Sequence, residues 1–464
     1  MKKIAFRLSL LLLTLALVFS LVACQTPTPQ GPVDTGSSPV TDPLTDPATD
    51  PATVPETDPA TDPATDPEET PPETDPATDP ATDPGETTPE TDPETDPATD
   101  PEETTPEIDP DTEPQEIKNL ILVIGDGMGL DHIAAGELTY GKDFGFADWD
   151  FVTVNTDSVY ANGYGPVLTD SAASGTALAT GHLTVNGYIG KDHNQVDVQT
   201  ILDYAKSLGK ATGVLTTDSL LGATPAAFSA HSRSRSNAQE IANSQIYSGV
   251  DLLGGATDST CTALISQIED QGYYYIDTFD NIDRAARKQK TYWQLDMAGT
   301  DADVQLEHAV YYALKMLSRN DEGFVLILEQ AYIDKYSHSN DFENTMHSVN
   351  SLNNTVEVIL EWMGNRTDTA VLITADHETG GLSVSAQKGA YTKSYVNKSG
   401  EVIYYDWSST NHTKSKVGLF TYGITTPDYS KFSYYGSPFT IKNIDVFNLM
   451  KDILDNPEAY NPYN

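Results

Sequence analysis

Short, mostly apolar runs alternate with longer amphipathic or small-residue segments along the chain from residue 117 onward. The apolar runs predict buried strands, at 120–124, 211–217, 324–329 and 370–375. The other segments predict helices, at 171–181, 198–208, 306–317 and 349–363. Alternation of this kind is typical of a parallel sheet. We therefore predict an α/β fold for residues 117–464, with a mostly parallel central sheet and helices on both faces.

Two stretches fit this alternation less well. Residues 236–300 are less regular, and we assign no particular element to them. Residues 384–410 are rich in Tyr, Ser and Lys and alternate in character. Alternation favours extended structure, so we predict a β-hairpin or loop at the rim of a ligand site, where it would shape substrate entry.

The N-terminus has the pattern of an export signal. A basic start is followed by a mostly apolar run at 10–21, which is shorter than the roughly 20 residues that a membrane-spanning helix needs. Leu21-Val-Ala-Cys24 then resembles a bacterial lipoprotein cleavage box. We predict that residues 1–23 are a lipoprotein signal peptide and that a lipid on Cys24 anchors the protein to the cell membrane, outside the cytoplasm. An ordinary signal peptide with a chance cysteine is the alternative.

Residues 24–116 have a different composition from the rest. They repeat Thr-Asp-Pro-Ala and Thr-Pro-Glu units without any Lys or Arg, and they carry most of the chain's formal net charge of −43. Such a segment buries too little apolar surface to fold, so we predict a disordered linker that acts as a stalk or as a passive acidic tail. The remaining residues are acidic too, which argues against nucleic acid as a specific partner.

Cysteine usage agrees with a fold that has no disulfide framework. Cys24 and Cys261 are the two cysteines of the chain. With Cys24 lipidated, Cys261 has no partner within the chain, and we interpret it as a small buried apolar residue.

Candidate ligand residues follow the predicted strands. Asp126, Glu329 and Asp376 lie at or just after strand ends, and Thr224 follows the 211–217 strand at a slightly longer distance. Ligands of open α/β sheets gather at the carboxyl ends of the strands. We therefore expect these four side chains to come together.

Several motifs carry a resemblance to a known family: Ile124-Gly-Asp-Gly-Met-Gly129, Thr169-Asp-Ser-Ala-Ala-Ser174, Ala223-Thr-Pro225, Glu329 with Asp334-Lys-Tyr-Ser-His338, Thr374-Ala-Asp-His-Glu-Thr379 and Asn411-His-Thr413. In order and spacing they resemble those of the alkaline phosphatases, over essentially all of residues 117–464. The Asp-Ser-Ala-Ala-Ser piece is highly specific, whereas Gly-Asp-Gly is not. The resemblance implies hydrolysis of phosphate monoesters through a covalent phosphoserine.

The resemblance makes Ser171 the nucleophile. A serine hydroxyl needs activation by a base or a metal ion, and no histidine lies beside Ser171 in the sequence. Metal activation is therefore the natural route. Ser171 also begins a predicted helix, whose amides favour a phosphoryl group. Without the family match, a simple helix N-cap would be the better interpretation.

The metal ligands divide into sets. Asp334 and His338 are four residues apart, so on a helix both point the same way. The resemblance implies one zinc ion held by Asp334, His338 and His412. It implies a second zinc ion held by Asp126, Asp376 and His377. It also implies a magnesium ion held by Thr224 and Glu329, with Asp126 bridging, and hard oxygen ligands suit magnesium.

Two cations complete the predicted site. Arg235 matches the family's phosphate-binding arginine, since a guanidinium can clasp two phosphoryl oxygens. Arg233 lies two residues away and is the alternative. Lys335 matches a variant of the family in which lysine contacts phosphate through water. Gly222 departs from the pattern, because many relatives have Asp or His there, next to the magnesium site. This departure bears on the affinity and identity of the third metal and not on the reaction.

Competing functions stay open at this point. A phosphodiesterase of the same superfamily would keep the metal core, but Thr224 and Glu329 of the third site favour the monoesterase. A sulfatase would need a Cys or Ser before x-Pro-x-Arg, which the sequence lacks. A non-catalytic surface protein with structural metals would suit the stalk but leaves Ser171 and Arg235 unexplained. The sequence leaves the oligomeric state open, a homodimer included.

Overall fold

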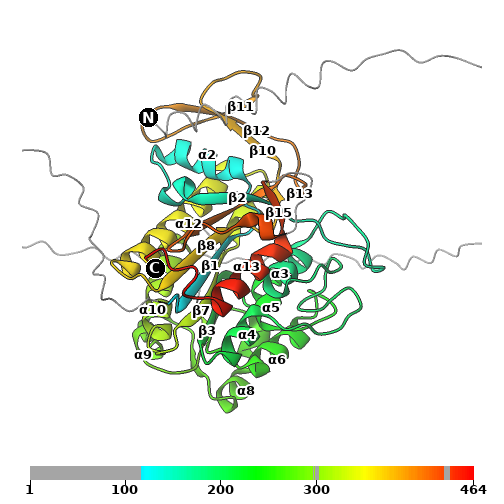
Figure 1. Cartoon of the computed structure of the whole chain (residues 1–464). Coiled ribbons are helices and arrows are strands. Elements are labelled where there is room, and N and C mark those ends of the chain that lie inside the picture. Colours follow the sequence, from blue (N-terminus) through cyan, green and yellow to red (C-terminus); the bar gives the residue numbers. More distant parts are fainter. Residues whose placement is uncertain (1–115, 296, 298–301, 433–438, 464) are drawn as a thin grey trace, which may run out of the picture. The chain divides into compact units, whose positions relative to one another are not determined.

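A computed structural model describes residues 116–295, 297, 302–432 and 439–463 (Figure 1). The predicted signal peptide, Cys24 and the linker up to residue 115 lie outside the described residues.

The main sheet has ten strands in the order β15-β2-β14-β8-β1-β7-β3-β4-β6-β5. Their bounds are Asn119–Gly125 (β1), Asp150–Asn155 (β2), Ala211–Ser219 (β3), Leu252–Ala256 (β4), Tyr274–Ile276 (β5), Thr291–Gln294 (β6), Phe324–Gln330 (β7), Thr369–Thr374 (β8), Val417–Tyr422 (β14) and Thr440–Lys442 (β15). All neighbours pair in parallel except β14, which is antiparallel to both β2 and β8. The predicted mostly parallel sheet is therefore confirmed.

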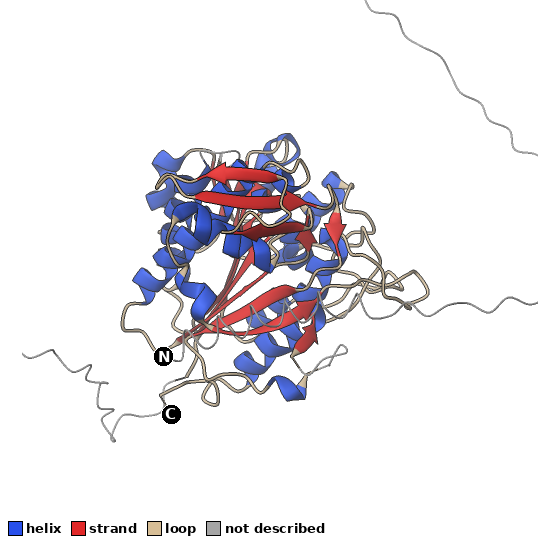
Figure 2. Ribbon diagram, turned by 90° about the horizontal axis from the view of Figure 1, so that it is seen from above, coloured by secondary structure: helices blue, strands red, loops and turns tan. Residues whose placement is uncertain are grey.

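The middle strands are apolar because both faces of the sheet are covered. Every residue of β1, β7 and β8 is buried, which is typical of parallel strands between two helical layers. Helices α10 (Ala302–Leu317) and α12 (Phe342–Met363) lie on one face. Helices α3 (Ser171–Thr180), α4 (Ile201–Ser207) and α5 (Ala223–Ser229) lie on the other (Figures 1 and 2).

The remaining elements are peripheral or short. The helices are Leu130–Tyr140 (α2), Ala238–Ser248 (α6), Ser259–Thr262 (α7), Ile265–Asp270 (α8), Ile282–Ala285 (α9), Tyr332–Ser337 (α11) and Asn443–Asp455 (α13), with 3₁₀ turns at Gly145–Asp148, Phe279–Asn281 and Tyr429–Lys431. Strands Glu378–Thr379 (β9) and His412–Thr413 (β13) pair with each other. Strands Leu382–Ser385 (β10), Lys393–Val396 (β11) and Val402–Trp407 (β12) form a three-stranded antiparallel sheet.

Three local expectations have clear outcomes. Residues 384–410 are extended, as predicted, in the sheet of β10, β11 and β12. Residues 236–300, to which we assigned no particular element, supply β4, β5 and β6 to the main sheet. Helix α4 starts at Ile201 rather than at 198, because Thr200 caps it by accepting a hydrogen bond from the Asp203 amide at 3.1 Å.

Cys261 is a free, buried cysteine, as predicted. The hydroxyl of Tyr292 donates a hydrogen bond to its sulfur at 3.2 Å. Burial raises the pKa of the thiol to about 11, so the residue is an inert core side chain rather than a reactive thiol.

Candidate metal centre and active site

Sheet register brings the predicted carboxylates to one edge. Ile124 of β1 pairs with both Glu329 of β7 and Thr374 of β8. Asp126 lies two residues after Ile124, and Asp376 lies two residues after Thr374. The two carboxylates therefore lie at the same level beyond the ends of the adjacent strands β1 and β8. All three are buried, with Asp126 7% exposed, Glu329 3% and Asp376 0%. The expected gathering of acidic side chains at the carboxyl ends of the strands is present.

Gly127 makes the close approach of these segments feasible. Its φ of 76° lies in the left-handed region, and a β-carbon there would come within 2.8 Å of the Asp334 backbone. Its amide donates a hydrogen bond to Asp376 Oδ1 at 3.2 Å. Only glycine meets both demands, which gives the glycine-flanked Asp126 motif a physical reason.

The first donor group consists of Asp126, Asp376 and His377. His377 Nε2 lies 3.5 Å from Asp126 Oδ1 and 3.2 Å from Asp376 Oδ2. Both of these carboxylate oxygens are buried without a hydrogen-bond partner. Buried carboxylate oxygens are normally paired or bound to a cation, so this group fits a metal ion.

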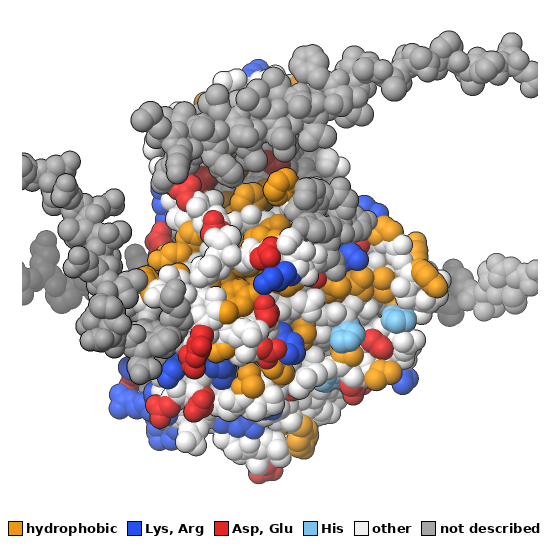
Figure 3. All heavy atoms as spheres, in the orientation of Figure 1, with side chains coloured by type: hydrophobic (Ala, Val, Ile, Leu, Met, Phe, Trp, Pro, Cys, Tyr) orange, Lys and Arg blue, Asp and Glu red, His pale blue; other side chains and the backbone are white. Residues whose placement is uncertain are grey.

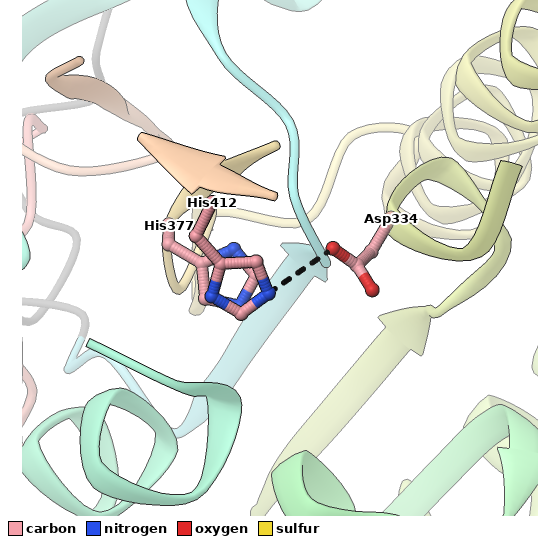
Figure 4. A group of neighbouring side chains, drawn as sticks. All are labelled: Asp334, His377 and His412. Atoms are coloured by element: carbon pink, nitrogen blue, oxygen red, sulfur yellow. Dashed lines mark ion pairs between the residues drawn. The ribbon is translucent and has the colours of Figure 1, made fainter. Parts of the chain in front are cut away.

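The second donor group consists of Asp334, His377 and His412, whose ligand atoms lie within 4.8 Å of one another (Figure 4). His412 Nε2 is 3.6 Å from Asp334 Oδ1, and its ring stacks on that of His377 with centroids 3.5 Å apart. His338 contacts the other oxygen of the same carboxylate, with Nε2 3.3 Å from Asp334 Oδ2. The predicted set of Asp334, His338 and His412 is therefore contiguous, and His377 joins it to the first group.

The outer nitrogens of two imidazoles are held by backbone carbonyls. His338 Nδ1 lies 2.7 Å from the Thr410 carbonyl, and His412 Nδ1 lies 2.9 Å from that of Thr169. A carbonyl only accepts, so each Nδ1 carries the proton and donates it. Each Nε2 then points a lone pair at a carboxylate, an arrangement that needs a proton or a cation between the two. This is the usual outer support of a metal-bound histidine.

The pKa shifts describe an excess of buried negative charge. Burial, then Asp376, Asp334 and Glu329, raise the pKa of Asp126 well above its ordinary value. Burial and then Asp218 raise the pKa of Glu329 to about 8. Burial lowers the pKa of His377, so this ring is neutral and able to bind a cation. Cations would relieve the repulsion between these carboxylates.

Ser171 lies beside both donor groups. It is the first residue of α3, and Asp170 is the N-cap, with Oδ1 accepting from the Ala173 amide at 2.9 Å. Ser171 Oγ is 3.2 Å from His377 Nε2 and 5% exposed. The cap role therefore belongs to Asp170, which leaves the Ser171 hydroxyl directed at the donor groups.

Small residues let α3 lie deep enough for this placement. A β-carbon on Gly175 would come within 3.2 Å of Ala227 on α5, so the two helices are nearly in backbone contact. Ser174 Oγ donates to the Asp376 carbonyl at 2.5 Å and ties the helix to the strand end. The run of Ala, Ser, Gly and Thr in α3 thus sets the depth of Ser171.

The two predicted cations each pair with an aspartate. Arg235 Nη1 lies 3.2 Å from Asp170 Oδ2, and Asp170 directly precedes Ser171 in the chain. Arg233 and Arg235 are both exposed. Lys335 Nζ lies 2.5 Å from Asp218 Oδ1. Thr224, in α5, is 1% exposed and its Oγ1 has no hydrogen-bond partner. It lies close enough to Glu329 to lower the pKa of that carboxylate.

Three residues of this region were missed from the sequence. Asp170 holds Arg235, Asp218 holds Lys335, and Thr379 donates to Asp334 Oδ1 at 2.5 Å. Asp218 had a usable signal, because it directly follows the predicted 211–217 strand. The other two lie inside quoted motifs, but a motif does not reveal which side chain supports which.

The raised pKa of Glu329 gives a test of the metal-free protein. A group with a folded pKa of about 8 against an ordinary 4.5 contributes stability below pH 4.5 that is lost as the pH rises to 8. We expect the unfolding free energy of chelated protein to fall across this window, by up to about 1.4 kcal/mol per pH unit from this group. Denaturant unfolding of Glu329→Gln should show a shallower fall. The exposed Glu357→Gln is the control, and equal slopes in parent and Glu329→Gln would contradict the expectation.

Comparison with known proteins places this site in a family. A family model described as alkaline phosphatase matches residues 117–270 and 257–433. Alkaline phosphatase 4 of Bacillus subtilis is 33% identical over 298 residues, 58% of this chain and 63% of that protein. The Escherichia coli alkaline phosphatase is 29% identical over 382 residues, 66% of this chain and 81% of that one. The chain thus matches under two thirds of the length of the Bacillus protein.

Solved structures agree with the sequence comparison. A cold-active alkaline phosphatase from Shewanella sp. superposes with a TM-score of 0.61 at 27% identity, covering 72% of this chain and 99% of that one. With the motifs, the sheet register and the two donor groups, these matches show that the chain belongs to the alkaline phosphatase family.

Proposed function

We propose that the protein hydrolyses phosphate monoesters through a covalent phosphoserine on Ser171, with two zinc ions and one magnesium ion. The observation that carries this proposal is the position of the Ser171 hydroxyl, 3.2 Å from the one imidazole that both donor groups share. A buried hydroxyl beside two clusters of metal-type ligands is suited to nucleophilic catalysis.

The resemblance of the motifs assigns a set of ligands to each ion, and the two donor groups together with the contact between His338 and Asp334 support these sets. One zinc ion would take Asp334, His338 and His412, and the other Asp126, Asp376 and His377. Magnesium would take Thr224 and Glu329, with Asp126 shared. Bound metal ions of this kind stabilise the charge of a transferring phosphoryl group and promote ionisation of the attacking hydroxyl.

The chain's own residues account for the two displacement steps. Ser171 Oγ gives up its proton and attacks phosphorus, forming an oxygen–phosphorus bond, while the bond from phosphorus to the ester oxygen breaks and that oxygen leaves with the electron pair and takes up a proton. Water then attacks the phosphoserine and frees Ser171 together with inorganic phosphate. The amides at the N-terminus of α3 and the Arg235 guanidinium would hold the non-bridging oxygens. Asp170 orients Arg235 through the 3.2 Å ion pair.

Charge distribution makes Arg235 the local attraction for an anion. Acidic and basic side chains are interspersed on the face seen in Figure 3, and the sequence as a whole is acidic. An anionic ester is therefore drawn in by the site's own cations rather than by a broad positive field.

A substrate panel tests the proposed function. Zinc- and magnesium-reconstituted protein should hydrolyse a monoester with a kcat/KM at least about a hundredfold above that for a diester or a sulfate ester, a difference of roughly 2.7 kcal/mol. Preference for the diester would make the protein a phosphodiesterase. Full metal content without any hydrolysis would favour a non-catalytic surface protein.

Arginine substitutions test the phosphate contact. Arg235→Ala should lower monoester kcat/KM by about a hundredfold and weaken inhibition by inorganic phosphate, because the guanidinium fork is lost. Diester turnover should fall less, since a diester has one charged oxygen fewer. Arg233→Ala is the matched control, being an exposed arginine two residues away. Reversed phenotypes would show that Arg233 is the phosphate ligand.

We also propose an extracytoplasmic location with a lipid on Cys24, which rests on the N-terminal sequence alone. In the part of the chain that the structure describes, no helix is long and apolar enough to span a bilayer. Cys24→Ala should move the protein from the membrane fraction into the medium or periplasm and abolish labelling with a fatty acid. Unchanged membrane association of Cys24→Ala would contradict the anchor.

A further inference from the structure

At position 222, a side chain would have to displace a neighbouring carboxylate. Gly222 precedes α5, and a β-carbon there would come within 2.8 Å of Asp218 Oδ2 and 3.0 Å of the Ser219 carbonyl. Two atoms at these separations cannot coexist without movement. The carboxylate of Asp218 therefore fills the space that the family's Asp or His at position 222 would use.

Strand β3 becomes irregular where Asp218 lies. Leu215 pairs with Gly254 and Ser219 pairs with Ala256. Between these two pairs β3 advances by four residues while β4 advances by two. Such a bulge re-aims side chains. The Asp218 side chain is half-buried and lies 2.5 Å from Lys335 Nζ. Asp218 also lies near Glu329, because its amide donates a hydrogen bond at 2.9 Å to the hydroxyl of Thr216, which in turn donates to the Glu329 carboxylate.

An independent observation points to a ligand beside this carboxylate. Thr224 Oγ1 is buried and makes no hydrogen bond of normal geometry, although it lies near enough to the Glu329 carboxylate to interact with it weakly and lower its pKa. A buried hydroxyl left in this way requires a partner. One hydroxyl and two carboxylates form a set of hard oxygen donors, which suits magnesium, an ion that also keeps some of its waters.

We propose that Asp218 supplies the third metal site with the carboxylate that position 222 lacks, directly or through a metal-bound water. In this chain the carboxylate lies at the end of β3, whereas the family's Asp or His lies at the start of α5. The bulge in β3 and the absence of a side chain at position 222 leave room for the Asp218 carboxylate. The inference rests on the proposed magnesium ion, and it assigns this chain's own ligand for that ion.

Magnesium binding to zinc-loaded protein measures this directly by calorimetry. We expect Asp218→Asn to weaken magnesium binding at least tenfold while zinc stays near two ions per chain. Asp197→Asn is the control, because that carboxylate also pairs with a lysine, Lys191, but outside the site. Magnesium affinity of Asp197→Asn should equal that of the parent.

Moving the carboxylate back is the sharper test. In Asp218→Ala/Gly222→Asp the obstruction is gone and a carboxylate stands at 222, so magnesium affinity should recover to within about threefold of the parent. Asp218→Ala alone should resemble Asp218→Asn. General damage to the fold would not produce this pattern, because the double variant regains the magnesium affinity that the single variant loses. Thermal melts of all variants check that they are folded.

Two results would overturn the inference. Unchanged magnesium affinity in Asp218→Asn would mean that Asp218 is only the counter-ion of Lys335. Absence of magnesium binding in the parent would show that the protein has no third metal site for Asp218 to complete. Acid-quenched trapping of phosphoserine in the parent separates these results from failure of the proposed function, because it depends on Ser171 and not on Asp218.

Discussion

Ser171→Ala should abolish the acid-stable phosphoserine and lower monoester kcat/KM by about ten-thousand-fold, equivalent to roughly 5.5 kcal/mol of barrier. The variant loses the only hydroxyl among the described residues that lies at hydrogen-bond distance from His377 Nε2, 3.2 Å away. Removing it takes away the nucleophile but none of the proposed metal ligands. Zinc content should therefore stay near two ions per chain while turnover collapses.

The control for this experiment is Ser229→Ala, another buried helical serine. Its hydroxyl donates only within α5, to the Pro225 carbonyl at 2.7 Å, so phosphoserine trapping should persist. A slow residual rate in Ser171→Ala is expected, because water can occupy the space of the lost hydroxyl. Turnover within tenfold of the parent would show that Ser171 is not the nucleophile.

The central strands could be predicted because their burial is complete. β1, β7 and β8 are buried at every residue, so their sequences are continuous apolar runs that no surface segment resembles. The ends of these runs then located Asp126, Glu329 and Asp376. Position at a strand end is a local property, and for this reason the site could be placed before any distance was known.

The outer strands could not be predicted in the same way. β4, β5 and β6 have five, three and four residues, and β4 contains two consecutive glycines. Such short segments carry no resolvable period, and their pairing depends on β3, which is distant in the sequence. These outer strands form because of tertiary contacts, whereas the central strands can be recognised from their sequences alone.

Supporting contacts in the site were hidden for a related reason. Asp218 and Lys335 are 117 residues apart, and Asp170 and Arg235 are 65 apart. An aspartate before a helix is sufficiently explained as a cap, so nothing in the sequence indicates that Asp170 also holds an arginine. The ligand types could be predicted from motifs, but the pairing between side chains required the fold.

His377→Asn should have the second large effect, because His377 belongs to both donor groups. It is fully buried, stacks on His412 and contacts Asp126 and Asp376. His377 is a proposed ligand of one zinc ion, and its ring stacks on His412, a proposed ligand of the other. We therefore expect zinc content to fall below one ion per chain and kcat/KM to drop at least about a thousandfold, roughly 4 kcal/mol. Metal analysis and monoester kinetics on the same preparation measure both quantities.

His338→Asn provides the comparison that makes this prediction specific. His338 is partly exposed, and the one carboxylate that its Nε2 contacts is that of Asp334, at 3.3 Å. Its loss should therefore remove one zinc ion and leave the group of Asp126, Asp376 and His377 loaded. His231→Asn is the neutral control, since its Nε2 lies 2.9 Å from the Val198 carbonyl, away from the donor groups. Loss of a single zinc ion in both variants would mean that His377 serves only the ion that it holds with Asp126 and Asp376, whereas loss of both ions in both variants would mean that the two ions bind only together. Full zinc content in His377→Asn would contradict the assignment of His377 as a zinc ligand, although it is the imidazole that joins the two donor groups of the described residues.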